Sequence, residues 1–297
     1  MSITLAQLER EVARRTGPYI TAAQASGEPT SSTPSSAIMP MLQTTALVGG
    51  PENLWILRRG VLQTGAPTPS PVAQRDRQRL VQAYDSGAGR VIVDRNWQIP
   101  MFPDELAEFV HLNPAQELYP SVMAGLRRCF LSDTTWAQPT SAYGDVDLTV
   151  QHPWITGTDQ VVGLRYGWMR PGATAPFNTY LSAGHVMLGG AWAGYTPASS
   201  WVTALRPAWT LVNGAYSATG PTEPTDVLDV DLDYAASAGH IEAWHMFPSR
   251  MYAAAAGNLQ ANQEMAAREF TRQALIWGPP DDRSVGFTSA FGLPTVA

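Results

Sequence analysis

Helical periodicity appears in this chain at three places that are far apart in the sequence. Apolar residues recur close to helical spacing within 3–16 and at intervals of three or four within 113–129, and 232–277 is rich in alanine with apolar residues available for one helix face. Between them lie two long regions, 42–112 and 140–230, in which short apolar runs alternate with Gly/Pro turns, a pattern typical of β structure. The sequence therefore predicts an α+β fold in which a helical core carries two inserted β modules.

We expect four structural parts. The helical core, with about four helices, comprises 1–20, 113–135 and 232–277. A small β module comprises 42–112, and a second module, 140–230, has turns at intervals of roughly ten residues, as a β-sandwich has. The final residues, 278–297, follow a Gly-Pro-Pro stop and repeat a Gly-Phe theme, which predicts an extended C-terminal arm.

Local motifs refine these boundaries. Asn113 followed by Pro114 is the expected order for an N-cap and the first helical residue, and Pro120 predicts a displaced or kinked helix start. Residues 21–40 are small, polar and Pro-rich and predict an extended or mobile linker, while 251–277 predicts a long helix with a weak point at its glycine. The expected strands are 42–48, 54–57, 79–84, 90–93 and 108–112 in the first module, and 146–150, 160–168, 185–188, 201–205 and 209–212 in the second.

Charge composition excludes several function classes. None of the 297 residues is lysine, so all 19 cationic side chains are arginine. This absence excludes phosphate-binding loops, Schiff-base enzymes and hydrolases with a catalytic lysine. The net charge of −6 argues against a protein that binds nucleic acid by itself.

The single cysteine, Cys129, excludes an internal disulfide and a multi-cysteine metal site. It lies on the apolar stripe of a predicted helix, where a buried and unreactive thiol is expected. No apolar run approaches the roughly 18 residues that a membrane-spanning helix needs, and the N-terminus lacks the apolar segment of a signal peptide. We therefore expect no membrane partner and synthesis in a cytosol-like compartment.

Three histidine or serine positions resemble catalytic motifs. His240 and His245 are five positions apart with Glu242 between them, whereas a zincin needs two histidines four apart and a glutamate beside the first. Ser182 lacks the first glycine of the hydrolase nucleophile elbow. Ordinary structural roles fit these residues better, so we expect no catalytic residue, no cofactor and no metal, and hence no enzyme.

Three alternating aspartates, Asp229, Asp231 and Asp233, resemble the start of a calcium-binding loop. The positions where that loop needs Gly and Glu hold Tyr234 and His240. The alternation with apolar residues favours a strand that leads into an Asp-capped helix, while an incidental cation here stays open.

Arginines occur in adjacent pairs near the ends of two predicted helices. Two interpretations of these pairs are open. The arginines either lie at solvated helix ends or form salt bridges to neighbouring subunits, in which arginine is favoured over lysine. The candidate interface residues, including two from the arm, are Arg14, Arg15, Arg127, Arg128, Phe287 and Phe291.

Two segments resemble virion proteins of tailed bacteriophages. They are TLAQLEREVARRTG, within 2–18, and a stretch within 80–130 that contains LVQAYDSGAGRVIVDRNW, ELAEFVHL and NPAQELYPSVMAGLRRC. Their layout, a short helix, a β insert and a helix that ends in paired arginines, is similar to that of head–tail connector adaptors. The resemblance implies a ring beneath the portal, a tail that reaches a neighbour, and no catalytic residues.

The expected function is that of a non-enzymatic structural subunit of a phage particle, above all a ring-forming head–tail connector or neck adaptor. Its partners would be copies of itself in a ring, the portal protein, a downstream neck or tail protein, and packaged DNA that passes without sequence-specific binding. It would be assembled in the host cytoplasm and reside at the head–tail junction of the virion. The alternatives are a tail, baseplate or capsid-decorating protein, or a carbohydrate-binding module that uses tryptophans of the second β module.

Overall fold

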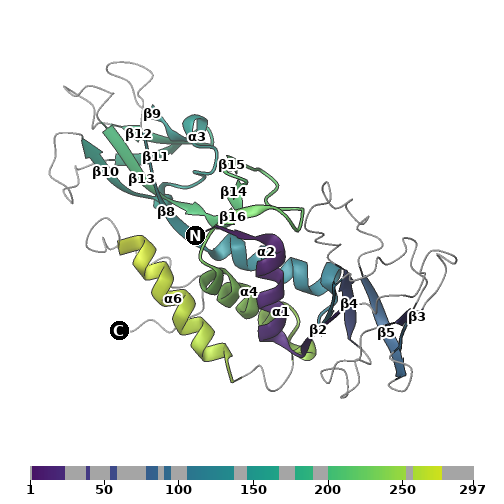
Figure 1. The fold of residues 1–297 in the computed structure, drawn as a ribbon. Coiled ribbons are helices and arrows are strands. Elements are labelled where there is room, and N and C mark those ends of the chain that lie inside the picture. The colour runs from purple at the N-terminus through teal and green to yellow at the C-terminus, as the bar shows by residue number, and fades with distance from the viewer. Residues whose placement is uncertain are drawn as a thin grey trace. The chain divides into compact units, whose positions relative to one another are not determined.

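The computed structural model describes residues 2–23, 38–40, 54–58, 78–85, 90–94, 106–136, 146–166, 178–189, 200–251 and 257–275. Helices and antiparallel sheets both occur (Figure 1), which confirms the α+β class. The chain forms two compact units: unit 1 is Met1–Leu5, Met123–Gly239 and Gln260–Ala297, and unit 2 is Ala6–Val122 and His240–Leu259. The four-part division expected from the sequence stays a prediction.

Unit 2 contains a six-stranded antiparallel sheet with the order β2-β7-β4-β5-β6-β3. Side chains alternate between the two faces of a strand, and one face of this sheet carries an apolar core. The core residues are Leu54, Ile56, Val81, Val91, Val93 and Phe109. The strands are β2 Tyr19–Ala23, β3 Ile38–Pro40, β4 Trp55–Arg58, β5 Gln78–Asp85, β6 Arg90–Val93 and β7 Leu106–Val110.

The sheet confirms part of the predicted first module. β5 and β6 match the strands predicted at 79–84 and 90–93 and pair antiparallel, and β4 matches the strand predicted at 54–57. The linker prediction is wrong at 21–23 and 38–40, because these residues lie in β2 and β3. The strand predicted at 42–48 lies outside the described residues.

Helix α1, Leu5–Thr16, buries the apolar stripe predicted for it, including Leu8 and Val12. Its polar face makes a long-range ion pair within unit 2. Arg10 Nη2 lies 2.6 Å from Oε1 of Glu108, a fully buried carboxylate on β7. Burial of a carboxylate is costly unless a cation compensates it, so this pair joins α1 to the sheet.

The helix start after β7 is displaced, as Pro120 predicts. Asn113 Oδ1 accepts hydrogen bonds from the N–H groups of Ala115 and Gln116, which confirms the N-cap. A π turn, Pro114–Leu118, comes first, and the N–H of Tyr119 donates to the Pro114 carbonyl. Helix α2 then runs over Tyr119–Arg128. Because proline has no N–H, the regular helical bond at position 120 cannot form.

Unit 1 contains three antiparallel sheets, two of three strands and one of four. The β-sandwich-like packing expected for the second module stays a prediction. The sheets are β10 Val161–Tyr166, β13 Ser200–Pro207 and β8 Phe130–Trp136; β11 Asn178–Ser182, β12 His185–Gly189 and β9 Val146–Asp147; and β1 Ser2–Thr4, β16 Val227–Asp229, β14 Leu211–Val212 and β15 Ala215–Tyr216.

Two strand predictions in this unit are partly wrong. The strand expected at 146–150 is only two residues long, and helix α3, Leu148–Gln151, follows it. The helix forms because Asp147 Oδ1 accepts from the N–H groups of Thr149 and Val150. A side-chain cap of this kind satisfies the first helical donors and favours a turn over a strand. The strand expected at 209–212 begins late, since a 3-10 turn, Ala208–Thr210, precedes β14.

Helix α4, Leu232–Met246, is buried along ten consecutive residues, 234–243. Its start confirms the Asp-capped helix, because Asp231 Oδ1 accepts from the Tyr234 N–H at 3.0 Å. Within unit 1 it touches α2 closely, and a Cβ atom added to Gly125 would lie 2.4 Å from the Gly239 nitrogen.

The last described helix, α6, Leu259–Leu275, starts later than the helix predicted at 251–277. Gly257 and Asn258 form a turn before it, so the predicted weak point is the place where the helix begins.

Candidate functional site

The adjacent arginines at the end of α1 contact their own chain. Arg14 Nη1 lies 3.6 Å from Glu11 Oε2, and the Arg14 guanidinium lies 4.9 Å from the centre of the Tyr19 ring. Arg15 Nε donates to Glu11 Oε1 at 3.2 Å. The Arg14 side chain is 52% exposed and that of Arg15 only 16%, so Arg14 has more surface for a contact with another subunit.

The second arginine pair ends α2. Arg127 is exposed, and its guanidinium lies 5.5 Å from the centre of the Trp209 ring. Arg128 is half-buried. The two arm residues, Phe287 and Phe291, lie outside the described residues. The interface role of all these side chains stays a prediction.

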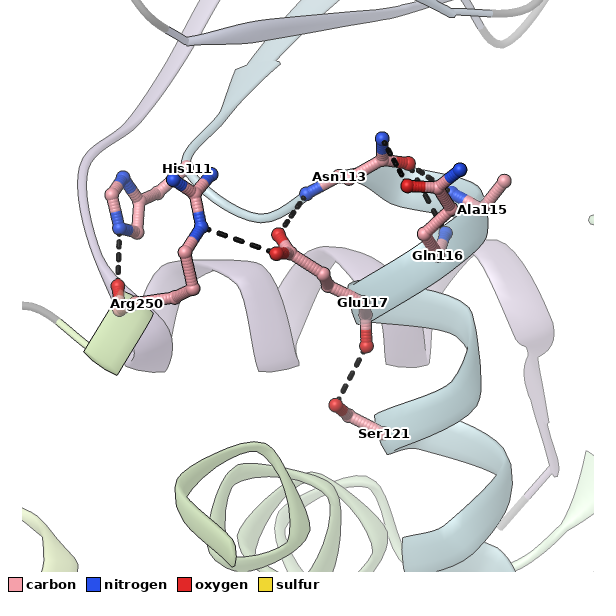
Figure 2. A network of polar contacts seen from close by, with 7 residues as sticks. All are labelled: His111, Asn113, Ala115, Gln116, Glu117, Ser121 and Arg250. Carbon is pink, nitrogen blue, oxygen red and sulfur yellow. Dashed lines mark hydrogen bonds and ion pairs between the residues drawn. The ribbon is translucent and has the colours of Figure 1, made fainter. Parts of the chain in front are cut away.

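A network of polar contacts in unit 2 surrounds the start of the π turn (Figure 2). The Asn113 N–H donates to Glu117 Oε2 at 2.7 Å, and Arg250 Nε lies 3.1 Å from Glu117 Oε1. Arg250 belongs to a 3-10 turn, Pro248–Arg250, that follows α4. One carboxylate therefore joins the helix start to a turn more than 130 positions further along the chain.

Two further contacts complete this network. His111 Nε2 donates to the backbone carbonyl of Arg250, as Figure 2 shows. Because a carbonyl oxygen can only accept, the imidazole must carry a hydrogen on Nε2. On the strand side, Gln78 Oε1 of β5 accepts from the Ala115 N–H at 3.1 Å. A Cβ atom at Gly17 would lie 2.9 Å from His111 Cβ, so glycine leaves room for the imidazole.

The network combines an imidazole, a carboxylate and a guanidinium, which together could serve acid–base chemistry. In each of these contacts the side chain instead binds a backbone group or another side chain of the network. The network therefore fixes the turn at Pro248–Arg250 against the start of the π turn. Sequence reasoning found Asn113 but not His111, Glu117 or Arg250. A capping box places Glu three residues after the cap, and the π turn here makes the spacing four. The contact with Arg250 had no sequence pattern that could indicate it.

Removing the Glu117 carboxylate tests the network. We expect Glu117→Ala to lower the free energy of unfolding by about 2 kcal/mol, because the Asn113 N–H and the Arg250 guanidinium both lose their partner. Glu117→Gln keeps an acceptor for the N–H and should cost less. Urea denaturation of both variants measures this, with Glu264→Ala on the exposed face of α6 as the control. Equal stability of the Glu117→Ala and Glu264→Ala proteins would contradict the network's structural role.

The two histidines of α4 lie in different environments, one in the interior and one at the surface. His240 is fully buried, and its Nε2 accepts from Trp244 Nε1 at 3.0 Å, whereas His245 Nδ1 lies 3.4 Å from Glu242 Oε1 at the surface. Burial and the nearby charge of Arg15 lower the pKa of His240 to about 4, so the ring is neutral at neutral pH. Among the residues that the structure describes, no group of three His, Cys, Asp or Glu side chains could hold a metal ion.

Ser182 lies at the tip of a β-hairpin and not on a strand-to-helix turn. It pairs with His185 across a two-residue turn in which Ala183 and Gly184 have φ of 51° and 85°. His185 Nδ1 lies 2.8 Å from Asp147 Oδ2, and Asp147 also caps α3. The histidine and aspartate thus join β12 to the start of α3.

Cys129 is buried, as the sequence predicts. Burial raises the pKa of its thiol well above the usual range, which disfavours the reactive thiolate. Tyr234 lies beside it, and burial likewise raises the pKa of the Tyr234 hydroxyl. Both groups therefore stay neutral in the folded protein.

No known protein family, no curated protein and no solved structure matches this chain. In the described ranges, no helix combines the length and the apolar character required to cross a membrane. Function must therefore be argued from the residues themselves.

Proposed function

We propose that this chain is a non-enzymatic structural subunit of a tailed-bacteriophage particle, a ring-forming adaptor between the portal and the tail. The observation that carries the proposal is the similarity of residues 2–18 and 80–130 to connector adaptors. α1 and α2 are built from these same residues. Burial shifts the pKa values of Cys129, Tyr234 and His240. These side chains make contacts inside the protein, which fits a structural role.

Exposed apolar side chains in unit 1 support a role in assembly. Leu181 on β11 and Val150 on α3 are 62% and 69% exposed. The two elements are neighbours of β12, since Val186 pairs with Leu181 and its N–H donates to Thr149 Oγ1 at 2.7 Å. Both side chains leave apolar surface available for a contact with another protein.

The decisive experiment locates the chain in the particle whose genome encodes it. Cryo-electron microscopy of particles that carry a tagged copy should place the tag in a ring at the head–tail junction. Deletion of the gene should give filled heads without tails. A tag on the tail tip, the baseplate or the capsid surface would support the alternative virion roles, and particles that lack the chain would contradict the proposal.

Charge reversal of the exposed arginines tests the interface. We expect Arg14→Glu with Arg127→Glu to reduce the yield of tailed particles by about tenfold or more when the variant complements the gene deletion, because like charges would then face acidic partners. The control is Arg268→Glu, a single charge reversal on the exposed side of α6, with which each single variant, Arg14→Glu and Arg127→Glu, is also compared. Thermal melting of all variants separates lost assembly from lost folding. Wild-type yield from a folded double variant would exclude these arginines from the interface.

A further inference from the structure

The turn between β14 and β15 of unit 1 carries an Asn-Gly pair. Of the seven asparagines in the sequence, Asn213 alone is followed by glycine. Val212 pairs with Ala215, so Asn213 and Gly214 form a two-residue hairpin turn. Their φ angles of 53° and 77° are those of a type I′ turn. Both residues are exposed, so water can reach them.

An asparagine that precedes glycine can lose its side-chain amide without an enzyme. The Gly214 nitrogen attacks Cγ of Asn213, the amide nitrogen leaves as ammonia with the displaced proton, and a succinimide ring closes. Water then opens the ring to aspartate or isoaspartate. The overall reaction consumes water and releases ammonia, so it needs no oxidant and no cofactor. Gly214 has no Cβ to shield its nitrogen, and a Cβ added there would meet no atom within 4 Å, so the turn leaves room for the attack.

The folded protein holds the Asn213 side chain at both of its polar atoms. Nδ2 donates to Asp226 Oδ1 at 2.9 Å, and Oδ1 accepts from the Val227 N–H, at the start of β16, at 2.8 Å. The Asn213 N–H also donates to the Val227 carbonyl at 2.8 Å. Attack by the Gly214 nitrogen requires the side-chain amide to leave both of its partners. The fold therefore opposes the reaction that the sequence favours.

Asp226, the acceptor of the Asn213 amide, is held in place by other parts of unit 1. Its Oδ2 accepts from the N–H groups of Thr222 and Glu223 at 2.8 and 2.9 Å. Burial opposes its charge, but these two bonds and the bond from Asn213 lower the pKa of the Asp226 carboxyl, which is ionised at neutral pH. Its backbone carbonyl accepts from the Leu5 N–H at 2.9 Å. The Asn213 amide thus links the hairpin turn to the loop before β16 and to the residue that follows β1.

We propose that Asn213 is a deamidation site whose reaction is suppressed while the hairpin turn is bonded to β16 and proceeds when the turn opens. The reactants are the chain's own Gly214 nitrogen and water. The product cannot restore the link. An aspartate places a second carboxylate against that of Asp226, and an isoaspartate lengthens the backbone of a two-residue turn. Opening of the turn therefore becomes irreversible, whether or not the chain is part of a phage particle.

The rates of deamidation in the folded and the denatured chain test the proposal. Full-length protein is incubated at neutral pH with and without denaturant, and peptide mapping by mass spectrometry follows the amide of residue 213. We expect its loss to be at least about tenfold slower in the folded chain, because two hydrogen bonds must break first. Asn258, which precedes leucine, is the internal control and should react far more slowly than Asn213 in the denatured chain. Equal rates at residue 213, or no loss in the denatured chain, would overturn the proposal.

Asp226→Ala removes the acceptor of the Asn213 amide and leaves the Asn-Gly sequence unchanged. In the folded variant we expect residue 213 to lose its amide about tenfold faster than in the wild type, because hydrogen bonds to a charged acceptor are the stronger kind. The matched control is Asp229→Ala, which removes an exposed carboxylate of β16 outside these bonds and should react at the wild-type rate. An unchanged rate in a folded Asp226→Ala protein would show that these bonds do not suppress the reaction. If this variant does not fold, the comparison of folded and denatured wild-type protein still decides the question.

Asn213→Asp reproduces the aspartate product and tests its effect on the turn. We expect Tm to fall by about 3–6 °C, because two carboxylates face each other and the amide donor is lost. The double variant Asn213→Asp with Asp226→Asn exchanges the two groups and restores an amide–carboxylate pair, so it should recover most of the lost Tm. A wild-type Tm in the single variant, or no recovery in the double variant, would contradict the proposed effect of deamidation on this turn.

Discussion

Replacing Gly125 with alanine is expected to lower the free energy of unfolding by about 3 kcal/mol. The new Cβ would lie 2.4 Å from the Gly239 nitrogen and 2.6 Å from its Cα, a backbone contact that no rotamer change can relieve. α2 and α4 would have to separate, and the residues buried along α4 would lose packing. Thermal melting should show a fall in Tm of about 6–12 °C for a chain of this size.

The direction of the change in the free energy of unfolding distinguishes the two possible outcomes. At an ordinary helical position, replacing glycine with alanine stabilises a protein by up to about 1 kcal/mol. A more stable Gly125→Ala protein would therefore show that α2 and α4 do not approach each other at this point. The matched control is Gly214→Ala, where the added Cβ meets no atom within 4 Å but φ is +77°. That variant should lose only about 1 kcal/mol from backbone strain.

Local motifs predicted the elements whose signals lie within a few residues of each other. The Asn113 cap and the displacement by Pro120 are both confirmed. In each case the physical cause is local, a side chain that bonds a neighbouring N–H or a proline that lacks one. The Asp-capped start of α4 belongs to the same group, because Asp231 bonds the N–H three residues further on.

Elements that depend on distant partners could not be predicted. β1 is a strand of three residues that exists because Ile3 pairs with Leu228 of β16. The same holds for the site in Figure 2, where His111 meets the backbone of Arg250. Short strands and single polar contacts have no periodicity of their own, and their stability comes from the tertiary partner. The sequence therefore predicted the long helices but not the short strand β1 or the contact between His111 and Arg250.

His240 makes the folded protein sensitive to acid. Burial and the charge of Arg15 hold its folded pKa at about 4, below the value of 6.5 expected for an unfolded chain. The unfolded chain therefore binds the proton more readily, so stability is fully present above about pH 6.5 and is lost as the pH falls toward 4. The shift corresponds to about 3 kcal/mol, with 1.36 kcal/mol for each pKa unit.

His240→Gln keeps an acceptor for the Trp244 N–H but cannot take up a proton. Urea denaturation at pH 7 and pH 4 should show that the wild-type chain loses about 3 kcal/mol more than this variant, while His245→Gln, at an exposed site, follows the wild type. Parallel losses in the wild type and the His240→Gln protein would mean that His240 is not held neutral in the folded state.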